Sequence, residues 1–181
     1  MSAAPILDVR GLTIELPAAD GPQKVLNNVD LRIGRGEIVG IVGESGAGKS
    51  TLGAALAGLL VSPLRVTEGE IWLNGVRIDR SSEDEWRRIR GRRIGMVFQD
   101  PLTSLDPLFT IGDQLTETIR VHLRLSASDA RRRATELLDD VGITEPGQRL
   151  SQYPHQFSGG MRQRVVIALA LCAEPDLIIA D

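Results

Sequence analysis

Alternating hydrophobic and polar positions dominate the first third of the chain. Residues 6–16 (ILDVRGLTIEL) and 25–33 (VLNNVDLRI) alternate with a period near two, which is typical of strands with one buried face. Residues 70–73 and 76–78 flank an Asn-Gly pair, a dipeptide that favours a tight hairpin turn. These patterns predict an antiparallel β-subdomain near the N-terminus.

Three continuous apolar runs have a different character. They are residues 38–42 (IVGIV), 94–98 (IGMVF) and 177–180 (LIIA). Runs of this length are typical of parallel strands buried on both faces. The third run leads directly into Asp181, and a carboxylate at the tip of a buried strand is expected to have a function.

Helical patterns fill most of the remaining chain. The predicted helices cover residues 51–60, 83–90, 111–125 and 158–172. A further helix is predicted after Ser128, which can cap it, because one face is shared by Ala130, Ala134, Leu137, Leu138 and Val141. We interpret residues 100–157 as a helical lobe inserted into an α/β core formed by residues 1–99 and 158–181.

A glycine-rich loop follows the strand predicted at residues 38–42 and precedes a predicted helix. It fits the phosphate-loop pattern G-x-x-x-x-G-K-[ST] in the strand–helix context that this motif requires. Its residues are Gly43, Glu44, Ser45, Gly46, Ala47, Gly48, Lys49, Ser50 and Thr51. Glycines let backbone N–H groups face phosphate oxygens, Lys49 reaches the β- and γ-phosphates, and Ser50 offers a hydroxyl to Mg²⁺. The loop therefore predicts binding of a nucleoside triphosphate with Mg²⁺.

Composition narrows the possible settings. The apolar content of 42% and the charged content of 25% are ordinary for a globular domain. The net charge of -3 argues against nucleic-acid binding by bulk charge, and no apolar run approaches the ~20 residues that span a bilayer. The single cysteine, Cys172, favours a reducing, cytoplasmic setting.

A second anion-binding pattern opens the predicted helix at residues 158–172. Ser158, Gly159 and Gly160 would expose backbone N–H groups and a hydroxyl at a helix start. Alone, such a junction is common. One nucleotide does not need two phosphate cradles from the same chain, so the second cradle is expected to serve a nucleotide bound by another copy.

The segment FSGGMRQR resembles the LSGGQ signature of ABC-type ATPases, with Phe157 in the usual Leu position and Met161 in the usual Gln position. Gln99 after IGMVF resembles the Q-loop of that family, and LIIAD resembles its Walker B strand. The stretches VFQDPLTSLDP and YPHQFSGGMRQRVVIALAL are similar to ATPase subunits of bacterial peptide and nickel importers. The resemblance covers essentially the whole chain.

This resemblance implies an α/β fold, a P-loop NTPase (RecA-like) core carrying the antiparallel β-subdomain and the helical lobe. It implies ATP and Mg²⁺ as cofactors, with Ser50, Gln99 and Asp181 on the metal side and Lys49 and Gln99 taking part in hydrolysis. Two such domains pair head to tail, so ATP lies between the Lys49 loop of one copy and residues 158–161 (Ser158, Gly159, Gly160 and Met161) of the other. The resemblance also implies that the lobe and the segment after Gln99 contact transmembrane permease subunits at the cytoplasmic face of the membrane, with a substrate-binding protein taking part indirectly.

Two departures from the family pattern are visible. The family stacks adenine on an aromatic residue before the phosphate loop, but this chain has none before Trp72, so Val25 is expected to give apolar contact only. In the family a glutamate that activates water follows the Walker B acid directly, whereas here the sequence stops at Asp181. We therefore expect a C-terminally truncated fragment of a longer ATPase, deficient in hydrolysis by itself.

Other functions remain open from the sequence. A non-transport ABC-type ATPase in DNA repair or translation would share these motifs, although such proteins tend to carry zinc cysteines, long coiled-coil insertions or tandem cassettes. A binding-only ATPase fragment is a further alternative, because the hydrolytic carboxylate is missing. Kinases and GTPases share the phosphate loop but lack the pattern at residues 158–161. The transported cargo is not encoded in this chain.

Overall fold

The computed structural model describes residues 4–100 and 104–181, which fall into two compact units. The first unit runs to Arg87 and also includes Asp181, and the second comprises residues 88–180. Each unit has its own apolar core. Within the described residues, no helix combines the length and the apolar character needed to span a membrane.

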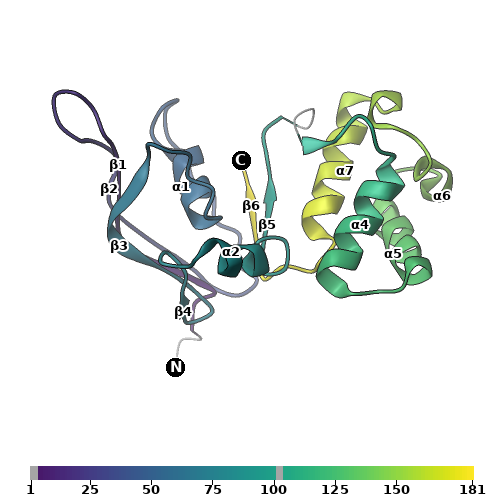
Figure 1. Cartoon of the computed structure of the whole chain (residues 1–181), viewed down its shortest axis with the longest axis horizontal. Helices are drawn as coiled ribbons and strands as arrows, with labels where there is room; N and C mark the ends of the chain where they lie inside the picture. Colours follow the sequence, from purple (N-terminus) through teal and green to yellow (C-terminus); the bar gives the residue numbers. More distant parts are fainter. Residues whose placement is uncertain (1–3, 101–103) are drawn as a thin grey trace. The chain divides into compact units, whose positions relative to one another are not determined.

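The first unit is built on an antiparallel sheet with strand order β2–β1–β3–β4 (Figure 1). Its strands are β1 (Leu7–Leu16), β2 (Gln23–Ile33), β3 (Arg65–Leu73) and β4 (Val76–Arg77). Leu7 of the central strand β1 lies opposite Ile33 of β2 and Leu73 of β3. Leu7, Leu73 and Ile71 are almost completely buried, because alternate side chains of these strands face the core. The antiparallel subdomain expected from the alternating pattern is confirmed.

The other face of this sheet carries a network of charged side chains. Asp8 accepts hydrogen bonds from Nε of Arg10 (2.9 Å) and from Nε of Arg32 (3.0 Å). Asp79 accepts from Nη2 of Arg77 (2.9 Å) and from the amide of Ile71 (2.9 Å). Hydrogen bonds from Arg10 and Arg32 lower the pKa of Asp8, although burial opposes this shift. Burial likewise opposes ionisation of Asp79, but the bonds from Arg77 and Ile71 leave its pKa lowered.

These lowered pKa values predict acid sensitivity of the first unit. A carboxylate whose pKa is depressed in the folded state stabilises the fold above its unfolded-state pKa of about 3.9, and this stability is lost as the pH falls through the folded-state value. We expect the free energy of unfolding, measured by urea titration, to fall as the pH drops below about 4. The double variant Asp8→Asn/Asp79→Asn should flatten this pH dependence. An unchanged slope in that variant would contradict the assignment.

Helices α1 (Lys49–Leu56) and α2 (Glu83–Ile89) complete the elements that begin in the first unit. Figure 1 shows α1 beside the sheet, where it contacts β2. α1 begins two residues earlier than the predicted helix at residues 51–60 and ends four residues earlier, at Leu56. Leu52, Ala55 and Leu56 are buried, so their packing holds the helix that follows the glycine-rich loop in place.

The strand predicted at residues 38–42 is not present, so this expectation is wrong for the structure described. The segment forms no strand, and Ile38 and Val42 are 98% and 96% exposed. A parallel strand needs hydrogen-bonded neighbours and cover on both faces. Among residues 4–100 and 104–181, no strand pairs with this segment, so Ile38 and Val42 remain uncovered.

The second unit combines a parallel strand pair with a bundle of helices. Strands β5 (Ile94–Val97) and β6 (Leu177–Ala180) pair in parallel, with Ile94 opposite Leu177. The prediction of parallel strands is confirmed here, but full burial is not, because Ile178 is 38% exposed. Within the described residues β6 pairs with β5 alone, which leaves its side chains only partly covered.

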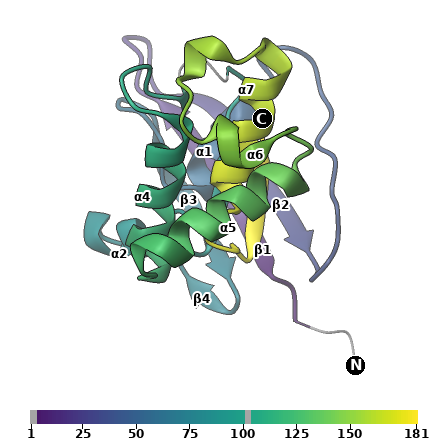
Figure 2. The same cartoon turned by 90° about the vertical axis from the view of Figure 1, so that its right-hand side faces the viewer.

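The helices of the second unit pack around a core in which Ile111, Leu115, Leu138 and Phe157 are almost completely buried. They are α4 (Ile111–Leu123), α5 (Ala127–Asp140), α6 (Pro146–Arg149), a 3-10 turn η1 (Pro154–Gln156) and α7 (Gly159–Leu171). Figure 2 shows α5 running across α7, and the two helices are in contact. The predicted helical segment between the strand-rich parts is thus largely helical.

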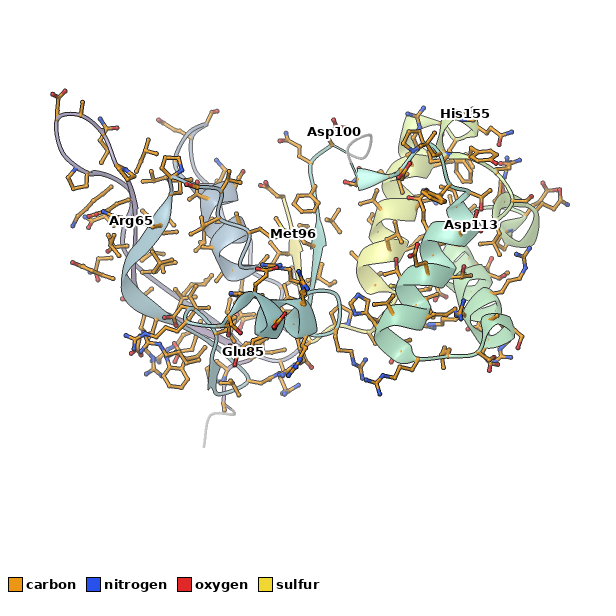
Figure 3. All side chains as sticks on the ribbon, in the orientation of Figure 1. Arg65, Glu85, Met96, Asp100, Asp113 and His155 are labelled. Carbon is orange, nitrogen blue, oxygen red and sulfur yellow. The ribbon has the colours of Figure 1, made fainter. Side chains whose placement is uncertain are left out.

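Local signals explain where these helices begin and end. Thr110 and Asp113 form a capping box at the start of α4, where Figure 3 labels Asp113. α4 ends at Leu123, two residues before the predicted end, because Arg124 adopts a left-handed conformation with φ of 56°. The cap of α5 is Ser126 and not the predicted Ser128, since Oγ of Ser126 accepts from the amide of Asp129. The predicted apolar face of α5 is nevertheless correct at Ala130, Ala134, Leu137 and Leu138, which are buried.

Candidate functional site

The glycine-rich loop at residues 43–49 closes around the side chain of its own lysine. Nζ of Lys49 donates to the carbonyl oxygens of Gly43 (2.8 Å) and Glu44 (2.7 Å). The amide of Ala47 donates to the carbonyl of Glu44 (3.2 Å), which tightens the turn. The ammonium group of Lys49 is therefore held at the centre of the loop, where an anion entering the loop would meet it.

The loop ends at the amino terminus of α1, whose N-cap residue is Gly48. No side chain caps this helix end, so its first amides are available to an anion, and the helix dipole favours negative charge there. Gly48 has φ of 85°, and a Cβ at this position would lie 2.6 Å from Cδ2 of Leu26. The position therefore requires glycine both for its conformation and for its close approach to β2.

The structure brings two of the predicted metal-side residues together. Oγ of Ser50 donates to Oδ1 of Asp181 at 2.9 Å, although 131 positions separate them in the sequence. A hydroxyl and a carboxylate are hard oxygen ligands of the kind that Mg²⁺ prefers. The two side chains therefore fit the metal expected from the sequence. Gln99 lies exposed after β5 in the second unit, and its role on the metal side stays a prediction.

The second anion-binding pattern forms the amino terminus of α7. Ser158 is the N-cap, and its Oγ accepts from the amide of Met161 (3.3 Å). Gly159 and Gly160 occupy the first helical positions, and a Cβ at either would meet no atom within 4 Å among the described residues. The first turn of α7 therefore faces open space, where the two glycines leave room for a ligand or a partner chain.

The residues beside this turn anchor it in the second unit. Phe157 is 2% exposed and belongs to the core, and Met161 packs partly buried against the same core. Nε of Arg162 donates to the carbonyl oxygen of Phe157 (3.0 Å). His155, labelled in Figure 3 in the turn before α7, stacks on the ring of Tyr153. The side chain of Met161 thus contributes packing, and the polar groups of this site come from Ser158 and the glycine amides.

Val25 of β2 was expected to touch the adenine ring. The structure places Val25 half-buried, with its carbonyl oxygen 3.1 Å from the position that a Cβ on Gly48 would take. It is therefore adjacent to the phosphate loop, while a contact with adenine stays a prediction. Sequence reasoning missed Arg162 and Arg164, which support α7 through backbone carbonyls. The presence of two arginines in the first two turns of α7 was the sequence signal that could have pointed to these contacts.

A lysine-centred phosphate loop at a helix start, combined with an antiparallel sheet and a helical unit, defines a nucleotide-binding cassette. The family described as "ABC transporter" matches residues 26–181. The chain belongs to the ABC transporter family.

Individual relatives agree with this assignment. The chain is 46% identical to the dipeptide transport ATP-binding protein DppD of Bacillus subtilis, over 97% of this chain and 53% of the relative. It is 45% identical to the oligopeptide transport ATP-binding protein OppD of Bacillus subtilis, over 97% and 49%. The chain spans about half the length of the curated relatives it matches.

A solved structure has the same fold. The dimeric ATP-binding cassette MJ0796, in a post-hydrolysis state bound to ADP and Pi, superposes with a TM-score of 0.85 at 33% identity. The alignment covers 97% of this chain and 73% of that cassette. The α/β P-loop NTPase fold expected from the sequence is therefore confirmed.

Proposed function

We propose that the protein is the ATP-binding, energy-coupling subunit of an ABC importer, which binds and hydrolyses Mg-ATP to power uptake of peptides. The observation that carries this proposal is the loop at residues 43–49, where the ammonium of Lys49 is held at the amino terminus of α1. The similarity to dipeptide and oligopeptide transport ATP-binding proteins supports peptides as cargo. Nickel is the alternative cargo that the sequence motifs allow.

Binding of ATP would replace the internal contacts of Lys49. Its Nζ would leave the carbonyls of Gly43 and Glu44 and donate to the β- and γ-phosphates, while the first amides of α1 face the same oxygens. Ser50 and Asp181 would hold Mg²⁺, which supplies neutralisation of the phosphate charge. Gln99, which follows β5, would link the γ-phosphate and the metal to the membrane partner. In this scheme Ser158, Gly159 and Gly160 serve ATP bound to a second copy, and the dimeric state of the cassette MJ0796 supports such pairing.

An exposed surface of the second unit is suited to a membrane partner. A groove along α4 is lined by Phe109, Asp113, Thr116, Glu117, Arg120, Val121, Arg124 and Leu125. Phe109 and Val121 expose 53% and 67% of their surface, and adjoining exposed apolar side chains suit contact with another protein. We assign this groove to contact with a transmembrane permease subunit at the cytoplasmic face of the membrane. A substrate-binding protein would deliver the cargo to that permease.

The proposal is tested with the complete protein in two steps. Calorimetric titration should give saturable binding of Mg-ATP, with AMP binding far more weakly because it lacks the β- and γ-phosphates. Co-expression with candidate permease subunits should yield a membrane complex in which peptide addition stimulates ATP turnover. Absence of nucleotide binding would refute the proposal outright. If no permease subunit binds the protein or changes its ATP turnover, the non-transport ATPase is favoured instead.

A further inference from the structure

The carboxyl end of α5 has an unusual electrostatic setting. Its last turn contains no basic residue and carries Asp139 and Asp140, although a helix C-terminus favours cations. The backbone there closes in a Schellman arrangement, in which the amide of Gly142 donates to Asp139 (2.8 Å) and that of Ile143 to Leu138 (2.8 Å). The carbonyl oxygens that come next in the chain remain available to an outside donor.

Arg164 of α7 supplies both the cation and the donor. Its Nη1 donates to the carbonyl oxygens of Val141 (2.9 Å) and Gly142 (2.9 Å). Gly142 has φ of 75°, and a Cβ there would lie 2.3 Å from Nη1 of Arg164. Glycine at this position therefore both ends α5 and admits the guanidinium. The result is a charge-assisted link between the end of α5 and the second turn of α7.

The link lies close to residues 158–160, the turn that the proposed function assigns to ATP bound by another copy. Arg164 follows the N-cap Ser158 by six residues, which is about 9 Å along a helix axis. A tilt of α7 by about 10° around this link would move its first turn by roughly 1.5 Å, and misplacements of about 1 Å are enough to impair a reacting geometry. The buried residues of α7 are small or β-branched (Val165, Val166, Ala168 and Ala170). Their packing is not directional, so the hydrogen bonds of Arg164 add a directional contact between α7 and the end of α5.

We propose that Arg164, seated on the carbonyls of Val141 and Gly142, is a positioning residue that aims residues 158–160 at the nucleotide of a paired copy. It touches no nucleotide itself. Its effect falls on pairing and on turnover and not on nucleotide binding by the copy that carries it. This inference rests on the proposed function, because it requires ATP to be shared between two copies.

The test uses the complete protein with Mg²⁺ and AMP-PNP, an ATP analogue that is not hydrolysed. Arg164→Met keeps a flexible, unbranched stem, shorter than that of arginine, but removes the donors and the charge. We expect its affinity for AMP-PNP, titrated at protein concentrations too low for pairing, to stay within about twofold of wild type. Nucleotide-dependent dimerisation, measured by sedimentation, should weaken about tenfold, as expected for loss of a charge-assisted hydrogen bond.

Three further variants decide between positioning and general structural support. Arg164→Lys, whose ammonium still donates to carbonyls, should recover most of the dimerisation, and Gly142→Ala should reproduce the defect by displacing the guanidinium. Arg131→Met is the matched control, since Arg131 is an exposed arginine of α5, and it should behave as wild type. The inference is overturned, while the proposed function stands, if Arg164→Met dimerises normally or if it loses AMP-PNP affinity as strongly as it loses dimerisation. Failure of the wild-type protein to bind AMP-PNP overturns the proposed function and this inference with it.

Discussion

Replacing Lys49 with alanine is expected to lower the affinity for Mg-ATP by roughly 100-fold, which corresponds to about 3 kcal/mol for a charge-assisted contact. The loop would lose the ammonium group that now lies on the carbonyls of Gly43 and Glu44 and that is free to transfer to the β- and γ-phosphates. ATP turnover should fall at least as strongly, since the same charge stabilises the transferring phosphoryl group. Calorimetric titration and a phosphate-release assay on the complete protein measure the two effects.

Two variants isolate the role of this charge. Lys24→Ala removes the other lysine, an exposed side chain whose Nζ donates to Oδ1 of Asn27 (3.1 Å) and not to the loop, and should leave binding unchanged. Lys49→Arg keeps a positive charge but replaces a compact ammonium by a planar fork, so it should recover little activity. Near-normal turnover in Lys49→Ala would remove the basis for assigning residues 43–51 to phosphate binding.

Much of the fold could be predicted because it depends on local patterns. The alternation in residues 6–16 and 25–33 is set by one buried sheet face, and it gave β1 and β2 to within two residues. The apolar face of α5 was equally visible, since it requires only a helical period. Cap choice was less predictable. Ser126 and Ser128 are both able to cap a helix, and only the folded backbone selects Ser126.

The failures concern features that depend on distant parts of the chain. The run at residues 38–42 has the composition of a central strand, but composition alone does not supply the paired neighbours that bury it. The hydrogen bond between Ser50 and Asp181 joins positions 131 residues apart and has no local signature. The sequence predicted only that both residues lie on the metal side, Ser50 from the loop motif and Asp181 from the family resemblance. The link from Arg164 to Val141 and Gly142 was missed for the same reason, because it joins two helices that no sequence pattern places in contact.

The variant Gly160→Asp is expected to leave nucleotide binding intact while abolishing pairing and hydrolysis. A Cβ at Gly160 meets no atom within 4 Å among the described residues, so the substitution is tolerated within the copy that carries it. In a head-to-tail pair the new carboxylate would face the γ-phosphate held by the other copy. Two unit charges about 4 Å apart repel by about 4 kcal/mol at an effective dielectric constant of about 20, which weakens pairing roughly 1000-fold. Photolabelling with an ATP analogue and sedimentation of the complete protein measure binding and pairing separately.

Matched substitutions separate charge, size and backbone effects in this prediction. Gly160→Asn has nearly the same shape without the charge, so its pairing defect should be much smaller than that of Gly160→Asp. Gly147→Asp places the same carboxylate on another helical glycine with open space around it, in α6, and should pair and turn over normally. If Gly160→Asp instead loses photolabelling, the turn at residues 158–160 acts on nucleotide bound by its own chain. If it pairs as well as Gly147→Asp, no phosphate approaches this turn, and the assignment of the second cradle to a partner's ATP is wrong.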